Sequence, residues 1–124
     1  MHNGSTWQMA GSDNYDSLVG SNPVGVVFSE WALANPSAWD YIRPILLENG
    51  GWALFITTPR GRNHAYQTHM MAQGSDAWFD DIKTVNDTGV LTAADIQSER
   101  DSGMSDGKVQ QEYFCSFEAD VEEQ

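Results

Sequence analysis

The chain has 124 residues, of which 40% are hydrophobic, and it contains five tryptophans and one cysteine. This length predicts one domain with a modest core. The formal net charge is −12 with only six lysines and arginines, which argues against direct nucleic-acid binding, because a phosphate backbone requires clustered cations. The lone Cys115 cannot form an internal disulfide, no apolar run reaches membrane-spanning length, and the first residues lack a signal-peptide pattern. We therefore expect a cytoplasmic protein that does not contact a membrane.

The first half of the chain predicts two buried strands joined by a helix. A short strand is expected at residues 6–10. Residues 24–28 and 52–57 are apolar runs without alternation, which predicts strands covered on both faces. Between them, Asn35 is expected to cap a helix over residues 36–47. Together these elements predict a right-handed βαβ unit.

The helix between the two strands has its own sequence signals. Its apolar residues recur at helical spacing and should face the sheet. Pro44 lies inside the pattern and is expected to kink the helix. Asn49-Gly50-Gly51 predicts a left-handed end. The apolar residues in question are Ala38, Trp39, Ile42, Ile45 and Leu46.

The second half predicts further helices and one more strand. Asn63 can cap a helix that ends near Gln73. Residues 78–85 predict a third, partly exposed strand. Thr92 and Asp95 form a capping-box pattern for a helix to about residue 102, and Ser105 can cap a last helix. The order indicates an α/β fold with a small, mainly parallel sheet and flanking helices.

Polar side chains follow both buried strands, where ligands of open α/β sheets bind. Ser29 and Glu30 follow the first strand. A carboxylate at a rigid strand tip suits a general base or a water-orienting group in phosphoryl transfer. The alternative is structural: Ser29 caps a short turn and Glu30 complements a helix dipole.

The second strand is followed by two hydroxyls and two arginines. Thr57 and Thr58 can hydrogen-bond a phosphate oxygen or a water, and Arg60 and Arg62 can bind phosphate through two hydrogen bonds each. The alternative is a plain turn with solvated arginines. The histidines do not predict a metal site.

Several segments together resemble phage terminase large subunits. Residues 26–33 (VVFSEWAL), followed by residues 36–46, resemble the Walker B region of that family. Residues 48–64 (ENGGWALFITTPRGRNH) resemble its coupling motif. Further similarity to sequences of this family is found at residues 3–5, 11–13 and 16–20. Residues 111–117 resemble the segment with which the chain of that family leaves the ATPase domain. The resemblance covers nearly the whole chain.

The resemblance implies a DNA-packaging motor that uses ATP and magnesium. Residues 1–119 would be part of its ATPase domain. Independently of the resemblance, the acidic residues 120–124 are expected to form a disordered tail. Glu30 would be the catalytic carboxylate that orients water. Ser29 would reach the metal through water. Thr57 and Thr58 would sense the γ-phosphate and couple hydrolysis to movement.

The same resemblance implies nucleotide-binding positions for Arg60 and Arg62. It also implies three partners, which are the missing N-terminal half of the ATPase domain, the terminase small subunit and the portal. The nuclease domain of the family is missing too.

One departure from the family limits what the chain can do. It contains no Gly-x-x-x-x-Gly-Lys-Ser/Thr loop to hold phosphates. We therefore expect a fragment that is inactive alone. The alternatives are a free-standing protein-binding module or structural remnant without nucleotide chemistry, and an independent small enzyme. In the family, the strand that leads into the phosphate loop lies beside the strand of the coupling motif. Without it, the edge of the strand at residues 52–57 should be covered by residues 78–85 or by a second copy of the chain.

Overall fold

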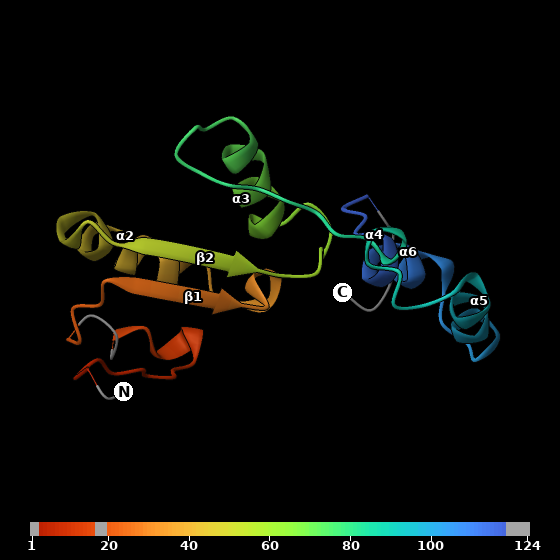
Figure 1. The fold of residues 1–124 in the computed structure, drawn as a ribbon, viewed down its shortest axis with the longest axis horizontal. Coiled ribbons are helices and arrows are strands. Elements are labelled where there is room, and N and C mark those ends of the chain that lie inside the picture. The colour runs from red at the N-terminus through yellow and green to blue at the C-terminus, as the bar shows by residue number, and fades with distance from the viewer. Residues whose placement is uncertain (1–2, 17–19, 119–124) are drawn as a thin grey trace. The chain divides into compact units, whose positions relative to one another are not determined.

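The computed structural model describes residues 3–16 and 20–118 and divides the chain into two compact units (Figure 1). The first unit comprises the residues up to Ser29 together with Ala34–Ile56. The second comprises Glu30–Leu33 and the chain from Thr57 onward. The tail expected at residues 120–124 lies outside the described residues.

The first unit is a βαβ unit. Strand β1 (Gly25–Ser29) and strand β2 (Trp52–Ile56) pair in parallel, with helix α2 (Ser37–Asn49) between them in sequence. Gly25 lies opposite Trp52, and Ser29 lies opposite Ile56. Figure 1 shows α2 behind the two strands. The α/β class and the parallel pairing are confirmed. A short 3-10 helix, η1 (Ser12–Asn14), lies before β1 in the same unit.

Helix α2 ends with the predicted left-handed glycine, but it begins one residue later than predicted: Pro36 and not Asn35 is its N-cap residue, and Pro36 makes no side-chain cap bond. The Asn35 side chain accepts a hydrogen bond from the Ser37 N–H at 3.0 Å. Gly50 adopts a left-handed φ of 62°, and its N–H donates to the carbonyls of the last turn. Pro44 lies inside the helix, which nevertheless continues to Asn49. These signals could be read from sequence because each acts within a few residues of the helix end.

The core of the first unit lies between α2 and one face of the sheet. Ala38, Ile42 and Leu46 are buried along one side of α2. The Phe28 ring stacks on the Phe55 ring with centroids 5.0 Å apart. Trp39 contacts Phe55 edge to face, also at 5.0 Å. Aromatic pairs of this kind stabilise a core beyond the area that they bury.

In the described part of the chain the other face of the sheet is about half exposed, contrary to the expectation of strands buried on both faces. Val27, Trp52, Leu54 and Ile56 point away from α2 and are 40 to 53% exposed. An apolar run of five residues predicts a strand with apolar side chains on both faces, but it does not show whether another part of the chain packs on each face. We call the surface formed by these four residues the open face.

The second unit is helical. It contains η2 (Trp31–Leu33), α3 (His64–Gln73), α4 (Val85–Thr88), α5 (Ala93–Asp101) and α6 (Asp106–Phe114). The predicted caps are confirmed: the Asn63 side chain accepts from Ala65 N–H, Thr92 and Asp95 form a capping box, and Ser105 accepts from Lys108 N–H. Helix α4 was not predicted.

Two predicted strands are wrong. Residues 6–10 and 78–84 form no regular element, and among the described residues the sheet consists of β1 and β2 alone. Asp80, inside the second of these segments, instead bonds the His69 ring at 2.9 Å. Residues 78–85 therefore do not pair with β2, and that proposed cover for its edge is incorrect. Association of two copies at this edge stays a prediction.

Candidate functional site

Ser29 and Glu30 lie at the carboxyl end of β1, as predicted. Ser29 is the last residue of the strand, and Glu30 follows with a left-handed φ of 53°. For a residue other than glycine this conformation costs roughly 1–2 kcal/mol. The Glu30 carbonyl accepts from the Leu33 N–H at 2.9 Å and so closes the turn of η2. Both residues are exposed. The Glu30 carboxylate has no hydrogen-bond or ion-pair partner within the described parts of the chain.

Thr57 is bonded to the segment that follows Glu30. Its Oγ1 accepts from the Ala32 N–H at 2.9 Å and donates to the Thr58 carbonyl at 2.9 Å. Ala32 is only two residues from Glu30, so the Cα atoms of Ala32 and Glu30 are at most about 7 Å apart. The structure thus brings two of the predicted site residues to one place, through a bond to the main chain.

A second set of bonds joins η2 to the start of α3. The Asn63 side chain caps α3 and also donates to the Ala32 carbonyl at 3.0 Å. His64 Nε2 donates to the Trp31 carbonyl at 2.7 Å, which places the proton on Nε2 because a carbonyl can only accept. The Trp31 indole N–H donates to Thr68 Oγ1 at 3.0 Å. Trp31 is 2% exposed, so these bonds form inside the second unit.

Sequence reasoning missed this network. Asn63 was predicted only as a helix cap, and His64 was considered only as a metal ligand. The signal was the combination of an indole, an amide and an imidazole flanking the two strand ends. Nothing in the spacing showed which main-chain groups they would meet.

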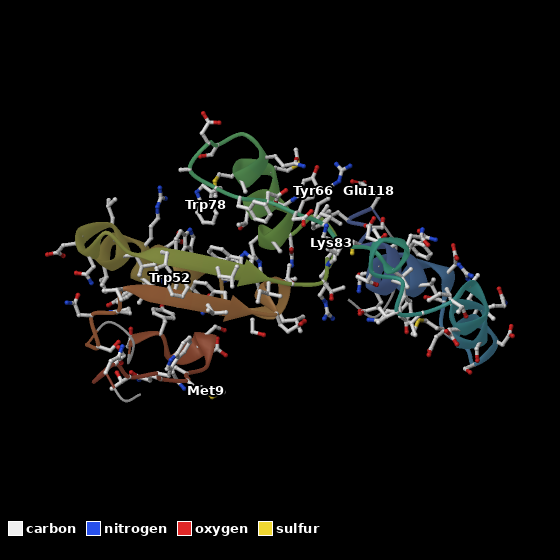
Figure 2. All side chains as sticks on the ribbon, in the orientation of Figure 1. Met9, Trp52, Tyr66, Trp78, Lys83 and Glu118 are labelled. Atoms are coloured by element: carbon white, nitrogen blue, oxygen red, sulfur yellow. The ribbon has the colours of Figure 1, made fainter. Side chains whose placement is uncertain are left out.

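The two arginines lie in different settings. Arg62 forms a bidentate pair with Glu118 at 2.8 and 2.6 Å, and its guanidinium lies 5.4 Å from the centre of the Tyr66 ring. Figure 2 shows Tyr66 and Glu118 close together. Glu118 raises the pKa of Arg62 through this hydrogen bond and its charge. Both partners are more than 60% exposed, so solvent weakens the pair. Arg60 is half-buried and has no partner among the described residues.

His69 belongs to a separate cluster in the second unit. Its Nδ1 bonds Asp80, and Phe117 stacks on its ring at 5.2 Å. Phe117 also contacts Tyr66 at 5.1 Å. This cluster fastens residues near the end of α6 to α3. Across residues 3–16 and 20–118, no three His, Cys, Asp or Glu side chains converge as a metal site would require.

Cys115 follows α6 in a left-handed conformation with a φ of 59°. Its thiol contacts the Lys83 carbonyl at 3.4 Å. Burial raises the pKa of this thiol, and the charge of Asp87 adds to the effect. The thiol is therefore protonated near neutral pH, which disfavours a nucleophilic role.

Known proteins show a partial similarity. A segment of 61 residues is 38% identical to the terminase large subunit of Thermus phage G20c, covering 48% of this chain and 13% of that protein. The terminase large subunit of Thermus virus P23-45 matches with the same identity and coverage. The chain is terminase-like over about half its length.

No family model and no solved structure matches the chain. The terminase-like segment spans 13% of the length of the curated relatives. Among the described residues, no helix is long and apolar enough to cross a membrane.

Proposed function

We propose that this terminase-like chain is part of a DNA-packaging ATPase, in which it supplies the water-orienting carboxylate Glu30 and a coupling segment at Thr57 and Thr58. The observation that carries the proposal is the 61-residue similarity to terminase large subunits. The βαβ unit adds support, because polar residues follow both of its parallel strands, where ligands of such sheets bind.

The Thr57 bonds support a coupling role. A phosphate oxygen that accepted the Thr57 hydroxyl proton would replace the Thr58 carbonyl as acceptor. That exchange would rotate the Thr57 hydroxyl group. The same hydroxyl oxygen accepts from the N–H of Ala32, which lies two residues after Glu30. A change at the phosphate would thus reach the segment that positions the carboxylate. Thr58 offers a second hydroxyl with no partner among the described residues.

The residues fit the nucleotide and magnesium only in part. Ser29 and Glu30 carry oxygen atoms of the kind that magnesium prefers, and Ser29 would act through a bound water. Arg60 carries a charge that can meet phosphate, whereas Arg62 would first have to leave Glu118. The phosphate-holding glycine loop and its lysine do not occur in these 124 residues. We therefore propose that ATP and magnesium bind only when a segment outside these 124 residues supplies that loop, and that small-subunit and portal contacts belong to that assembly.

Calorimetric titration with magnesium-ATP tests the first part. The chain alone should show no saturable heat and no turnover, and the Glu30→Ala variant should behave identically. Tight binding that Glu30→Ala removes would overturn the inactive-fragment proposal in favour of an independent enzyme.

A chimera tests the second part. Residues 24–73 replace the corresponding segment of the Thermus phage G20c terminase large subunit, and ATP hydrolysis is measured. We expect activity that falls at least about a hundredfold with Glu30→Gln, as is typical for loss of a proton-handling group. A folded chimera whose hydrolysis ignores Glu30→Gln would refute the catalytic role.

A further inference from the structure

The open face is an apolar surface that the proposed ATPase role does not use. It consists of Val27 on β1 and Trp52, Leu54 and Ile56 on β2, which are 40, 53, 48 and 52% exposed. Gly25 and Ser29 complete this side of the sheet, so it carries no charge. Figure 2 shows the Trp52 side chain on the sheet.

One end of the open face is flat because of a glycine. A Cβ atom on Gly25 would come within 2.2 Å of the Trp52 indole. The indole therefore lies directly over the Gly25 main chain, its partner in the strand register. A broad indole supported by backbone is the kind of surface on which binding energy concentrates.

The physics of parallel sheets predicts that this face is covered in use. Parallel sheets occur almost only with both faces covered, usually by helices. On the opposite face, α2 covers the strands with Ala38, Ile42 and Leu46, spaced four residues apart. A five-residue strand is roughly 16 Å long, which a helix of about eleven residues matches. A covering helix would thus present apolar residues at positions i, i+3 or i+4, and i+7.

A second copy of the chain fits this surface poorly. The exposed parts of the four side chains amount to on the order of 350 Å², whereas a stable dimer buries about 800 Å² on each partner. Each copy also carries a net charge of −12, so two copies would repel each other. The first unit alone has four carboxylates (Asp13, Asp16, Asp40 and Glu48) and one arginine (Arg43) in its described residues. Charge complementarity therefore favours a basic partner.

We propose that the open face binds an amphipathic helix of another polypeptide, with an apolar stripe toward Trp52 and Leu54 and a net-basic polar side. The apolar stripe supplies the contact, and the basic side matches the charge of this chain. This binding does not depend on ATP or on Glu30, so it can be tested whether or not the ATPase proposal holds.

The probe is a 14-residue helix made of leucine and lysine, with leucines at helical spacing and blocked termini. Proton–nitrogen correlation spectra of the whole chain locate the contact. We expect saturable shifts at the amides of β1 and β2 and at the Trp52 indole N–H. A peptide of the same composition in alternating order, and a helix with glutamate in place of lysine, should each bind at least about tenfold more weakly.

A matched pair of variants makes the test specific. Leu54→Gln changes the open face, whereas Leu47→Gln changes a leucine on α2 that is 81% exposed. Leu54→Gln should weaken binding about fivefold to tenfold, the value expected for burying half a leucine side chain, and Leu47→Gln less than about twofold. Ile56→Gln serves as a second open-face variant.

Several results would overturn the proposal. These are absence of binding, shifts confined to the second unit, equal effects of Leu54→Gln and Leu47→Gln, or equal affinity for the acidic helix. Analytical ultracentrifugation adds one more: a dimer of the chain that Leu54→Gln dissolves would assign the face to a second copy.

Discussion

Removing the Thr57 hydroxyl tests the bond that holds the segment after Glu30. Valine has nearly the same shape, so Thr57→Val keeps the side-chain volume but removes the acceptor of the Ala32 N–H and the donor to the Thr58 carbonyl. Ala32 is 6% exposed, and water cannot easily replace the lost partner. A buried N–H without an acceptor costs about 1–3 kcal/mol. We take about 1.5 kcal/mol, which corresponds to roughly tenfold faster amide exchange at Ala32 if that amide exchanges by local opening.

The neighbouring threonine provides a control. Thr58 has a hydroxyl with no partner among the described residues, so Thr58→Val should leave Ala32 exchange within about twofold. Thr57→Ser keeps an acceptor and should restore most of the protection. Hydrogen exchange followed by NMR measures all three variants, with urea unfolding as a check on global stability. Unchanged Ala32 exchange in Thr57→Val, or an equal effect of Thr58→Val, would refute the reasoning.

Three further predictions concern packing and capping. Gly25→Ala should destabilise the chain by about 1 kcal/mol, because the new methyl displaces the Trp52 indole, and the cost should shrink in a Trp52→Ala background when both are measured by urea unfolding. Ile42→Ala should cost about 2–5 kcal/mol because Ile42 is 1% exposed, and a thermal midpoint that barely moves would contradict the assigned core. Thr92 lowers the pKa of Asp95 below its ordinary 3.8 by donating hydrogen bonds to its carboxylate. The stability that this carboxylate adds is therefore fully present above that value and is lost as the pH falls through the lowered pKa. A carbon-detected titration of the Asp95 carboxyl group measures its pKa directly. In an unfolding series over pH, the Asp95→Ala variant should lack the loss of stability that protonation of this carboxylate causes.

The helix ends could be predicted because their chemistry is local. Asn35, Asn63, Thr92 and Ser105 each satisfy an N–H within three residues, and Gly50 supplies the left-handed end of α2. None of these depends on a distant part of the chain. The same locality explains why the helices over residues 36–47 and 63–73 were placed to within a few residues.

The wrong strands failed for the opposite reason. A strand is stable only with a partner, and composition does not show whether one is available. Residues 78–85 contain Trp78, Ile82 and Val85, but these are spaced by four and three residues and do not alternate. Asp80 pairs with His69 and Val85 begins α4, so the segment follows local caps and contacts on α3 instead of a sheet.

The site was predictable as a set of residues but not as a set of bonds. The position of Glu30 and Thr57 after parallel strands followed from the apolar runs. The bond from Ala32 N–H to Thr57 joins residues that are 25 positions apart, and Ala32 follows closely on Glu30, which adopts a left-handed φ. A left-handed glutamate is uncommon, and nothing in the sequence indicates it. The pair of Arg62 with Glu118 was equally unpredictable, because the two residues are 56 positions apart in the sequence.

The contrast between the bonded polar groups and the open face indicates where a partner matters most. Thr57, Asn63, His64 and Trp31 already have hydrogen-bond partners within the second unit. A partner would gain little by replacing them, because exchanging one hydrogen bond for another is nearly neutral. An exposed apolar surface differs, because burial there removes area from water without breaking any bond. The main free energy for association should therefore come from the open face, and salt should weaken only the smaller, charge-dependent part of the binding.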